Sequence, residues 1–149
     1  MSVSLYDANL WVALAFAAHP HAKLATKHFA ELDSGDPAAF CRASQQSFLR
    51  LVTRPALQQA YATPLISNAS AWEKCQELLS LPQILWLDEP AGLSDLWHQL
   101  ASPPTASPKV WMDAYLAAFA IGHDLQFVTL DGDFKRFEKN GLKLKLLTP

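Results

Sequence analysis

The chain has 149 residues, of which 50% are hydrophobic and 17% are charged, and its formal net charge is −2 at pH 7. This length and composition are typical of one soluble globular domain, which we take to span residues 1–149. This slightly negative net charge argues against a general electrostatic attraction to nucleic acid. Nucleic acid could still bind to a local basic patch on the surface.

The cysteines and histidines give no sign of a zinc site. Cys41 and Cys75 lack paired-ligand spacing, which suggests a reducing compartment. The five histidines form no cluster with zinc-ligand spacing. The apolar run at residues 10–18 has no basic leader and is too short to cross a bilayer. We therefore expect a cytoplasmic protein.

The first half of the chain alternates predicted strands and helices. In chain order these are a strand at residues 3–6, a buried helix at 9–18, a helix ending near 32, and a strand at 38–41. Ser44 can cap the next helix, which continues to Thr53 and stops before Pro55. Ser70 then begins another helix, with Glu73 three residues later to complete a capping box.

The second half continues the alternation. It contains a strand at residues 84–87, a helix at about 91–100, a strand at 127–130, a short helix through 137, and a strand near 142–147. Between these, Ser107 as N-cap and Pro108 at the first helical position begin a helix that Gly122 ends. Such alternation predicts an α/β fold, a three-layer α/β/α sandwich around a mainly parallel sheet of four to five strands.

Three aspartates lie where predicted strands and helices meet. Asp7 follows the first strand, Asp131 follows the fourth, and Asp113 lies near the start of an apolar helix that has no other charge between residues 110 and 121. Ligands bind at the carboxyl ends of parallel strands, where we expect these carboxylates to meet. An unpaired buried carboxylate is costly, so a cation is required. Clustered hard oxygen ligands favour Mg²⁺ or Mn²⁺.

Each aspartate also has a purely structural interpretation. Asp7 could cap the first helix, and Asp131 or Asp133 could cap the short helix that follows them. Asp113 could form an ion pair, because buried charges are usually paired. The candidate partners for that ion pair are Arg42, Arg50 and Lys109.

Four segments of the chain, in order, resemble the PIN domain family, and more narrowly its VapC-type toxins of toxin–antitoxin pairs. The segments are LYDAN at residues 5–9, CRASQQSFLRLVT at 41–53, WMDAYLA at 111–117 and TLDGDF at 129–134. The likeness extends over essentially the whole chain. The PIN fold that it implies agrees with the α/β/α sandwich predicted from the alternation of strands and helices.

The resemblance implies a toxin of a type II toxin–antitoxin system that cleaves tRNA, rRNA or mRNA as a metal-dependent endoribonuclease and so inhibits translation. It implies a homodimer and a VapB-like antitoxin as partner. Carried over by position, the catalytic acids that bind Mg²⁺ or Mn²⁺ would be Asp7, Asp113 and Asp131, with Asp133 as an accessory ligand. The residues that would orient water or contact RNA are Asn9, Arg50 and Lys109.

One position departs from the family pattern. The helix after the second strand usually supplies a glutamate to the acidic site, and aligning residues 48–50 places Gln45 there, or less well Gln46. An amide oxygen can bind a metal but brings no charge, so we predict weakened metal affinity. This substitution keeps open an alternative function, a catalytically weak PIN-derived module that binds RNA.

Other functions are less compatible with the sequence. A haloacid-dehalogenase-like phosphatase needs a second acid where Asn9 stands. A nucleotide-binding switch needs a glycine-rich phosphate loop, and none of the five glycines are suitably grouped for one. A Ser/His/Asp hydrolase would need a nucleophile elbow. The cations Lys135 and Arg136 could guide RNA or simply form a solvated helix face. Apolar residues in the early helices and around Trp72 could form a homodimer interface, an antitoxin groove, or ordinary core.

Overall fold

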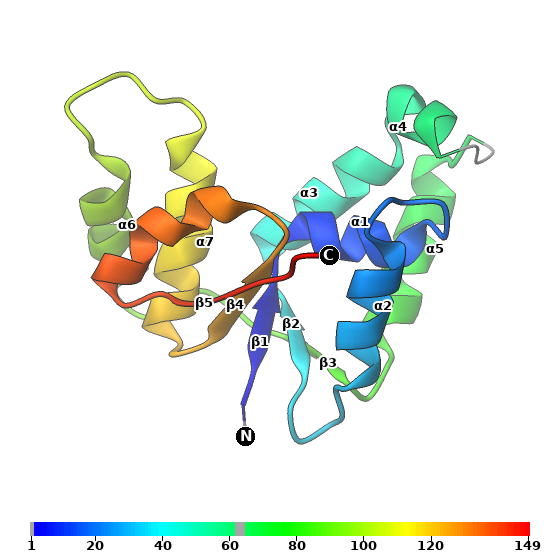
Figure 1. Cartoon of the computed structure of the whole chain (residues 1–149), viewed down its shortest axis with the longest axis horizontal. Coiled ribbons are helices and arrows are strands. Elements are labelled where there is room, and N and C mark those ends of the chain that lie inside the picture. Colours follow the sequence, from blue (N-terminus) through cyan, green and yellow to red (C-terminus); the bar gives the residue numbers. More distant parts are fainter. Residues whose placement is uncertain (1, 62–64) are drawn as a thin grey trace.

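The computed structural model describes residues 2–61 and 65–149. Its centre is a five-stranded sheet with the order β3-β2-β1-β4-β5, in which every neighbouring pair is parallel (Figure 1). The strands are β1 (Ser4–Tyr6), β2 (Ala38–Phe40), β3 (Ile84–Trp86), β4 (Gln126–Thr129) and β5 (Lys143–Leu146). The fold is therefore the predicted α/β class, and all five strands run the same way.

Helices connect the strands. They are α1 (Ala8–Ala15), α2 (Ala22–Ala30), α3 (Arg42–Val52), α4 (Pro55–Ala60), α5 (Asn68–Leu79), α6 (Leu93–Ala101) and α7 (Val110–Gly122), followed by a 3-10 helix, η1 (Gly132–Asn140). None of the described helices is long and apolar enough to cross a membrane.

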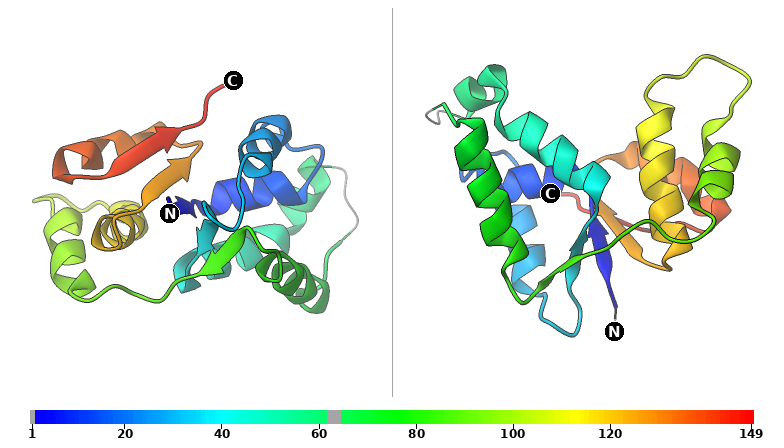
Figure 2. Two further views of the ribbon diagram at one scale, coloured as in Figure 1. Left: turned by 90° about the horizontal axis from the view of Figure 1, so that it is seen from below. Right: turned by 180° about the vertical axis from the view of Figure 1, so that it is seen from behind.

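The two faces of the sheet pack against different helices, because successive side chains of a strand point to opposite faces. Leu5 and Phe127 belong to a core shared with α6, α7 and η1, whereas Tyr6 and Val128 belong to a core shared with α1, α2, α3 and α5. Figure 2 shows these two groups of helices on either side of the sheet. The three-layer arrangement is thus confirmed.

The second core is dominated by stacked aromatic rings. The rings of Trp11 and Phe40 lie parallel with their centroids 4.0 Å apart, and Phe48 meets Phe40 edge-on at 6.3 Å. All three side chains are fully buried. This cluster packs α1 against β2 and α3, and Asp7 is the single residue that separates β1 from α1.

Several helix starts differ from the prediction. Ser67, not Ser70, caps α5 and accepts a hydrogen bond from the Ser70 backbone N–H at 3.0 Å. Cys41 is the N-cap of α3, with the Ser44 hydroxyl accepting from the Cys41 N–H at 3.0 Å. Ser107 does not cap α7, which begins three residues later. The helix α4 was not predicted.

Candidate active site

Asp7 and Asp131 come from adjacent strands. Asp7 directly follows β1 and Asp131 lies two residues after the end of β4, and these strands pair in parallel with Leu5 opposite Phe127. Their side chains therefore lie at the same carboxyl edge of the sheet, as expected. Asp113 approaches this edge from the first turn of α7.

Thr129 joins the two strand-end aspartates. Its hydroxyl donates to Asp7 Oδ2 at 2.7 Å and accepts from the Asp131 backbone N–H at 3.0 Å. The other Asp7 oxygen, Oδ1, accepts from the Ala8 N–H at 2.8 Å, so Asp7 also caps α1. Thr129 is fully buried. Sequence reasoning missed this residue, although it stands inside the TLDGDF segment.

The surroundings of Asp7 disfavour its charged form. Its pKa is raised to about 6, mainly by burial and in smaller part by the neighbouring charges of Asp113 and Asp131. The hydrogen bonds from Thr129 and Ala8 act in the opposite direction. Burial also raises the pKa of Asp113. The charge of Asp131 thus acts on both Asp7 and Asp113 in the direction that raises their pKa values.

Two cations contact these acids. Lys109 Nζ lies 2.8 Å from Asp133 Oδ2 and 3.7 Å from Asp131 Oδ2. Arg136 Nη2 donates to Asp113 Oδ2 at 3.2 Å. Asp113 therefore does form the ion pair considered as its structural interpretation, but with a partner that was not among its three candidates. Asp131 also accepts a hydrogen bond from the Asp133 N–H at 2.9 Å, so it does cap η1.

The carboxylates have the right chemistry for a hard cation but do not converge in this conformation. Among residues 2–61 and 65–149, no three His, Cys, Asp or Glu side chains are grouped closely enough to hold a metal ion. Lys109 and Arg136 instead contact Asp133 and Asp113. The buried Asn9 Oδ1, two residues after Asp7, finds no hydrogen-bond partner in the described part of the chain. This buried acceptor is therefore unsatisfied within the described residues.

Gln45 has partners on helices rather than on the aspartates. Its side chain is 4% exposed, its Oε1 accepts from Arg42 Nη1 at 2.6 Å, and its Nε2 donates to Cys75 Sγ at 3.8 Å. The contact with Cys75 ties α3 to α5, whereas the contact with Arg42 lies within α3. Gln46, the alternative position, is exposed to solvent.

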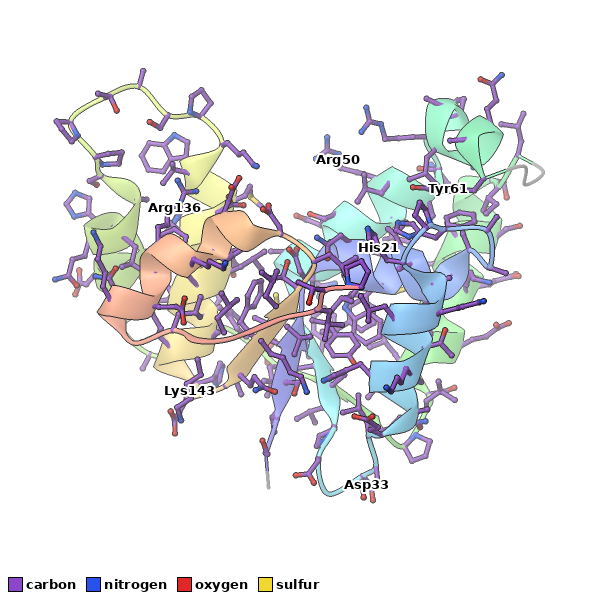
Figure 3. The ribbon with its side chains drawn as sticks, in the orientation of Figure 1. His21, Asp33, Arg50, Tyr61, Arg136 and Lys143 are labelled. Atoms are coloured by element: carbon purple, nitrogen blue, oxygen red, sulfur yellow. The ribbon has the colours of Figure 1, made fainter. Side chains whose placement is uncertain are left out.

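Arg50 lies away from the acid-bound cations. It is exposed near the end of α3, and Figure 3 shows it on the opposite half of the molecule from Arg136, which projects from η1. Arg50 also lines a groove of about 300 Å³ between α3 and α5, together with Leu49 and the half-exposed Trp72. This groove, rather than the acids, is the immediate environment of Arg50.

Comparison with known proteins relates the whole chain to one family. The PIN domain family model matches residues 5–140. Ribonuclease VapC41 of Mycobacterium tuberculosis is 38% identical over 96% of this chain and 97% of its own length. Ribonuclease VapC31 of the same species is 31% identical over 89% and 92%.

Solved structures of toxin–antitoxin proteins have the same fold. A VapBC2 structure from Rickettsia felis, bound to a DNA fragment from its promoter, has a TM-score of 0.67 at 16% identity and covers 98% of this chain and 99% of its own. VapC20 of Mycobacterium tuberculosis, a toxin that cleaves the sarcin-ricin loop, has a TM-score of 0.63 at 17% identity, covering 93% and 95%.

Proposed function

This chain belongs to the PIN domain family, and from that membership we propose that it is the toxin of a toxin–antitoxin pair and acts as an endoribonuclease. Its similarity to ribonucleases over nearly its full length supports hydrolysis of RNA phosphodiester bonds. The structural observation that carries the assignment is the link through the Thr129 hydroxyl, which joins the Asp7 carboxylate to the Asp131 backbone N–H and so keeps the two strand-end aspartates adjacent, beside Asp113. This acidic edge is where we place the reaction.

The residues proposed to hold the metal are Asp7, Asp113 and Asp131, with Asp133 as an accessory ligand. Carboxylate oxygens suit Mg²⁺ or Mn²⁺. Such an ion supplies a water of lowered pKa and stabilises negative charge on phosphoryl oxygens. The buried Asn9 oxygen has no hydrogen-bond partner among the described residues, which fits a site that is completed by a further polar ligand. Gln45 is a possible neutral ligand only if its Oε1 leaves Arg42.

Lys109 and Arg136 are proposed to change partners during the reaction. They now contact Asp133 and Asp113, whose convergence on one ion would require these contacts to loosen. Both side chains reach the acidic edge from its rim and remain partly exposed. Once released, each cation could bind a phosphate oxygen of the RNA backbone, as lysine and arginine commonly do.

A VapB-like antitoxin is the expected protein partner. Two structural neighbours, from Rickettsia felis and Haemophilus influenzae, are VapBC proteins. The groove of about 300 Å³ beside Trp72 offers an apolar surface to a partner helix, either from the antitoxin or from a second copy of this chain. We propose both a homodimer and an antitoxin complex.

A second function is favoured by one observation. The Gln45 oxygen is already bonded to Arg42, and the resemblance places this neutral amide where the family has a glutamate, so the proposed site has less negative charge for a metal. A catalytically weak module that binds RNA without turnover would have this property. The two functions differ in whether RNA is cleaved when Mg²⁺ or Mn²⁺ is added.

The deciding experiment is cleavage of structured RNA with Mg²⁺ or Mn²⁺ by the wild type, Asp7→Ala and Asp95→Ala. Asp95 is an exposed carboxylate on α6 and serves as the matched control. We expect cleavage by the wild type and Asp95→Ala but not by Asp7→Ala. Equal cleavage by all three proteins would reject the assignment of Asp7. RNA binding without metal-dependent cleavage by the wild type would favour the second function.

A further inference from the structure

A hollow outside the acidic edge opens between the end of α6, the start of α7 and the second half of η1. Its volume is about 340 Å³, within the ~300–1,000 Å³ range of small-ligand sites. We propose that this hollow binds one nucleobase of the RNA next to the cleaved phosphate and contributes to sequence preference. The proposal rests on the proposed ribonuclease function.

Arg136 connects the hollow to the acidic edge. Its side chain lines the hollow, while its Nη2 atom lies 3.2 Å from Asp113 Oδ2. Val110, which also lines the hollow, is one helical turn before Asp113 on α7. The hollow and the acidic edge are therefore separated by the Arg136 side chain alone. Neighbouring nucleotides of one RNA strand could occupy the hollow and the acidic edge at the same time.

The hollow combines the three kinds of group that recognise an unpaired base. The part-exposed Leu100 and Val110 provide an apolar surface, and the Arg136 guanidinium, 5.0 Å from the centroid of the buried Phe137 ring, provides a planar cation. Gln99 and Asn140 provide exposed amides, each with both donor and acceptor atoms. Single-stranded RNA is read in this way, by stacking on aromatic or guanidinium planes and by hydrogen bonds to base edges.

Charge favours RNA over a protein helix as the occupant. Lys139 and Arg136 bring two cations to the lining, and the described lining contains no Asp or Glu. By contrast, the groove beside the half-exposed Trp72 is the more apolar surface and lies between α3 and α5. Cations at the hollow match the phosphates that flank a bound base.

The test compares the wild type with a Gln99→Ala/Asn140→Ala double variant. Both side chains are exposed, and the thermal midpoint should stay unchanged. Each protein would cleave an RNA pool with randomised bases, and the cleavage ends would be sequenced. We expect the wild type to prefer particular bases at one position beside the cut, and the double variant to lose that preference by about fivefold or more. The control is Glu138→Ala, an exposed η1 residue outside the hollow, which should keep the wild-type preference.

The possible failures can be told apart. If the wild type and the double variant both cleave with the same base preference, the subsite is overturned while the ribonuclease function stands. If the wild type shows no metal-dependent cleavage, the ribonuclease function fails and the subsite with it. Loss of antitoxin binding by the double variant, with its base preference intact, would assign the hollow to a protein partner and overturn the proposal.

Discussion

At the level of single residues, the pKa of Asp7 is set by contributions of opposite sign. Burial and two nearby carboxylates raise its pKa to about 6, while the Thr129 hydroxyl and the Ala8 N–H stabilise its charged form. Its ordinary pKa is 3.8. The folded protein therefore holds a proton on Asp7 over a pH range in which the unfolded chain has already lost it.

Asp7→Asn should stabilise the protein in the absence of divalent metal. The raised pKa means that stability falls as pH rises from about 4 to about 6, and the full penalty remains above pH 6. A pKa shift of about two units lowers the free energy of unfolding by about 3 kcal/mol when Asp7 is charged. The asparagine recovers this amount but makes weaker hydrogen bonds with Thr129 and Ala8, at a cost of about 1 kcal/mol. We expect a gain of about 1–2 kcal/mol at pH 7.5, measured by urea denaturation with EDTA. At pH 4 the gain should disappear; an equal gain at both pH values would contradict this origin.

Gln45→Glu should increase metal affinity. The substitution restores the charge that the family glutamate supplies, and affinity for hard cations rises with ligand charge. Because Arg42 Nη1 lies 2.6 Å from the Gln45 oxygen, part of that charge would be neutralised. We expect Mn²⁺ to bind about three- to tenfold more tightly in isothermal titration. Gln46→Glu is the matched control, since Gln46 is exposed, and should change little. Unchanged or weaker binding by Gln45→Glu would remove Gln45 from the site.

The sequence predicted the positions of the three aspartates better than it predicted their partners. Asp7 and Asp131 follow strands of a parallel sheet, and Asp113 stands out in an apolar helix, so local patterns were sufficient. Thr129 and Arg136 were not predicted in their roles. Arg136 reaches Asp113 across 23 positions of the chain, between η1 and α7, and only the packing of these helices determines which cation meets which carboxylate.

At the level of secondary structure, serine and proline residues marked the neighbourhood in which a helix begins or ends, but not the residue at which it does so. The Ser107 hydroxyl lies 3.3 Å from the Thr105 hydroxyl instead of capping α7, and the helix begins at Val110 after a turn. Pro55 was interpreted as the end of α3, yet it is also the first residue of α4. Proline suits this first position because it needs no hydrogen bond from its nitrogen.

Phe40→Ala should strongly destabilise the packing of α1 and α3 on β2. Phe40 stacks on Trp11, meets Phe48 edge-on, and is fully buried. Replacing a buried phenylalanine with alanine typically costs about 3–5 kcal/mol. Chemical denaturation should show this loss.

Trp11→Phe provides the comparison. It keeps an aromatic ring against Phe40 and removes a buried indole N–H that has no partner in the described part of the chain. We expect a loss of less than about 2 kcal/mol, because the cavity cost is partly offset by removing the unsatisfied group. A larger loss for Trp11→Phe than for Phe40→Ala would contradict this account of the cluster.

At the level of the whole molecule, the alternation of strands and helices was enough to predict three layers and a parallel sheet. It was not enough to predict the strand order, in which the first strand lies at the centre between β2 and β4. Short buried strands such as Ala38–Phe40 have side chains that fit several neighbours, so their sequence does not specify a partner.

Trp72→Glu should disrupt association of the chain with a second copy. Trp72 is 50% exposed beside a groove between α3 and α5, where a charge would oppose apolar contact. Size-exclusion chromatography with light scattering should show a dimer for the wild type and a monomer for the variant. Trp111→Glu is the matched control, because Trp111 is 54% exposed but lies on α7. A dimer that survives Trp72→Glu would place the interface elsewhere.

The hydrogen bond from Thr129 to Asp7 spans 122 positions of the chain. During synthesis, β1 is made long before its neighbour β4, so the two halves of the acidic edge cannot meet until Thr129 has been added to the chain. A message broken before codon 129 therefore yields a product without the full site, and shorter translation products lack the residues that the reaction is proposed to need.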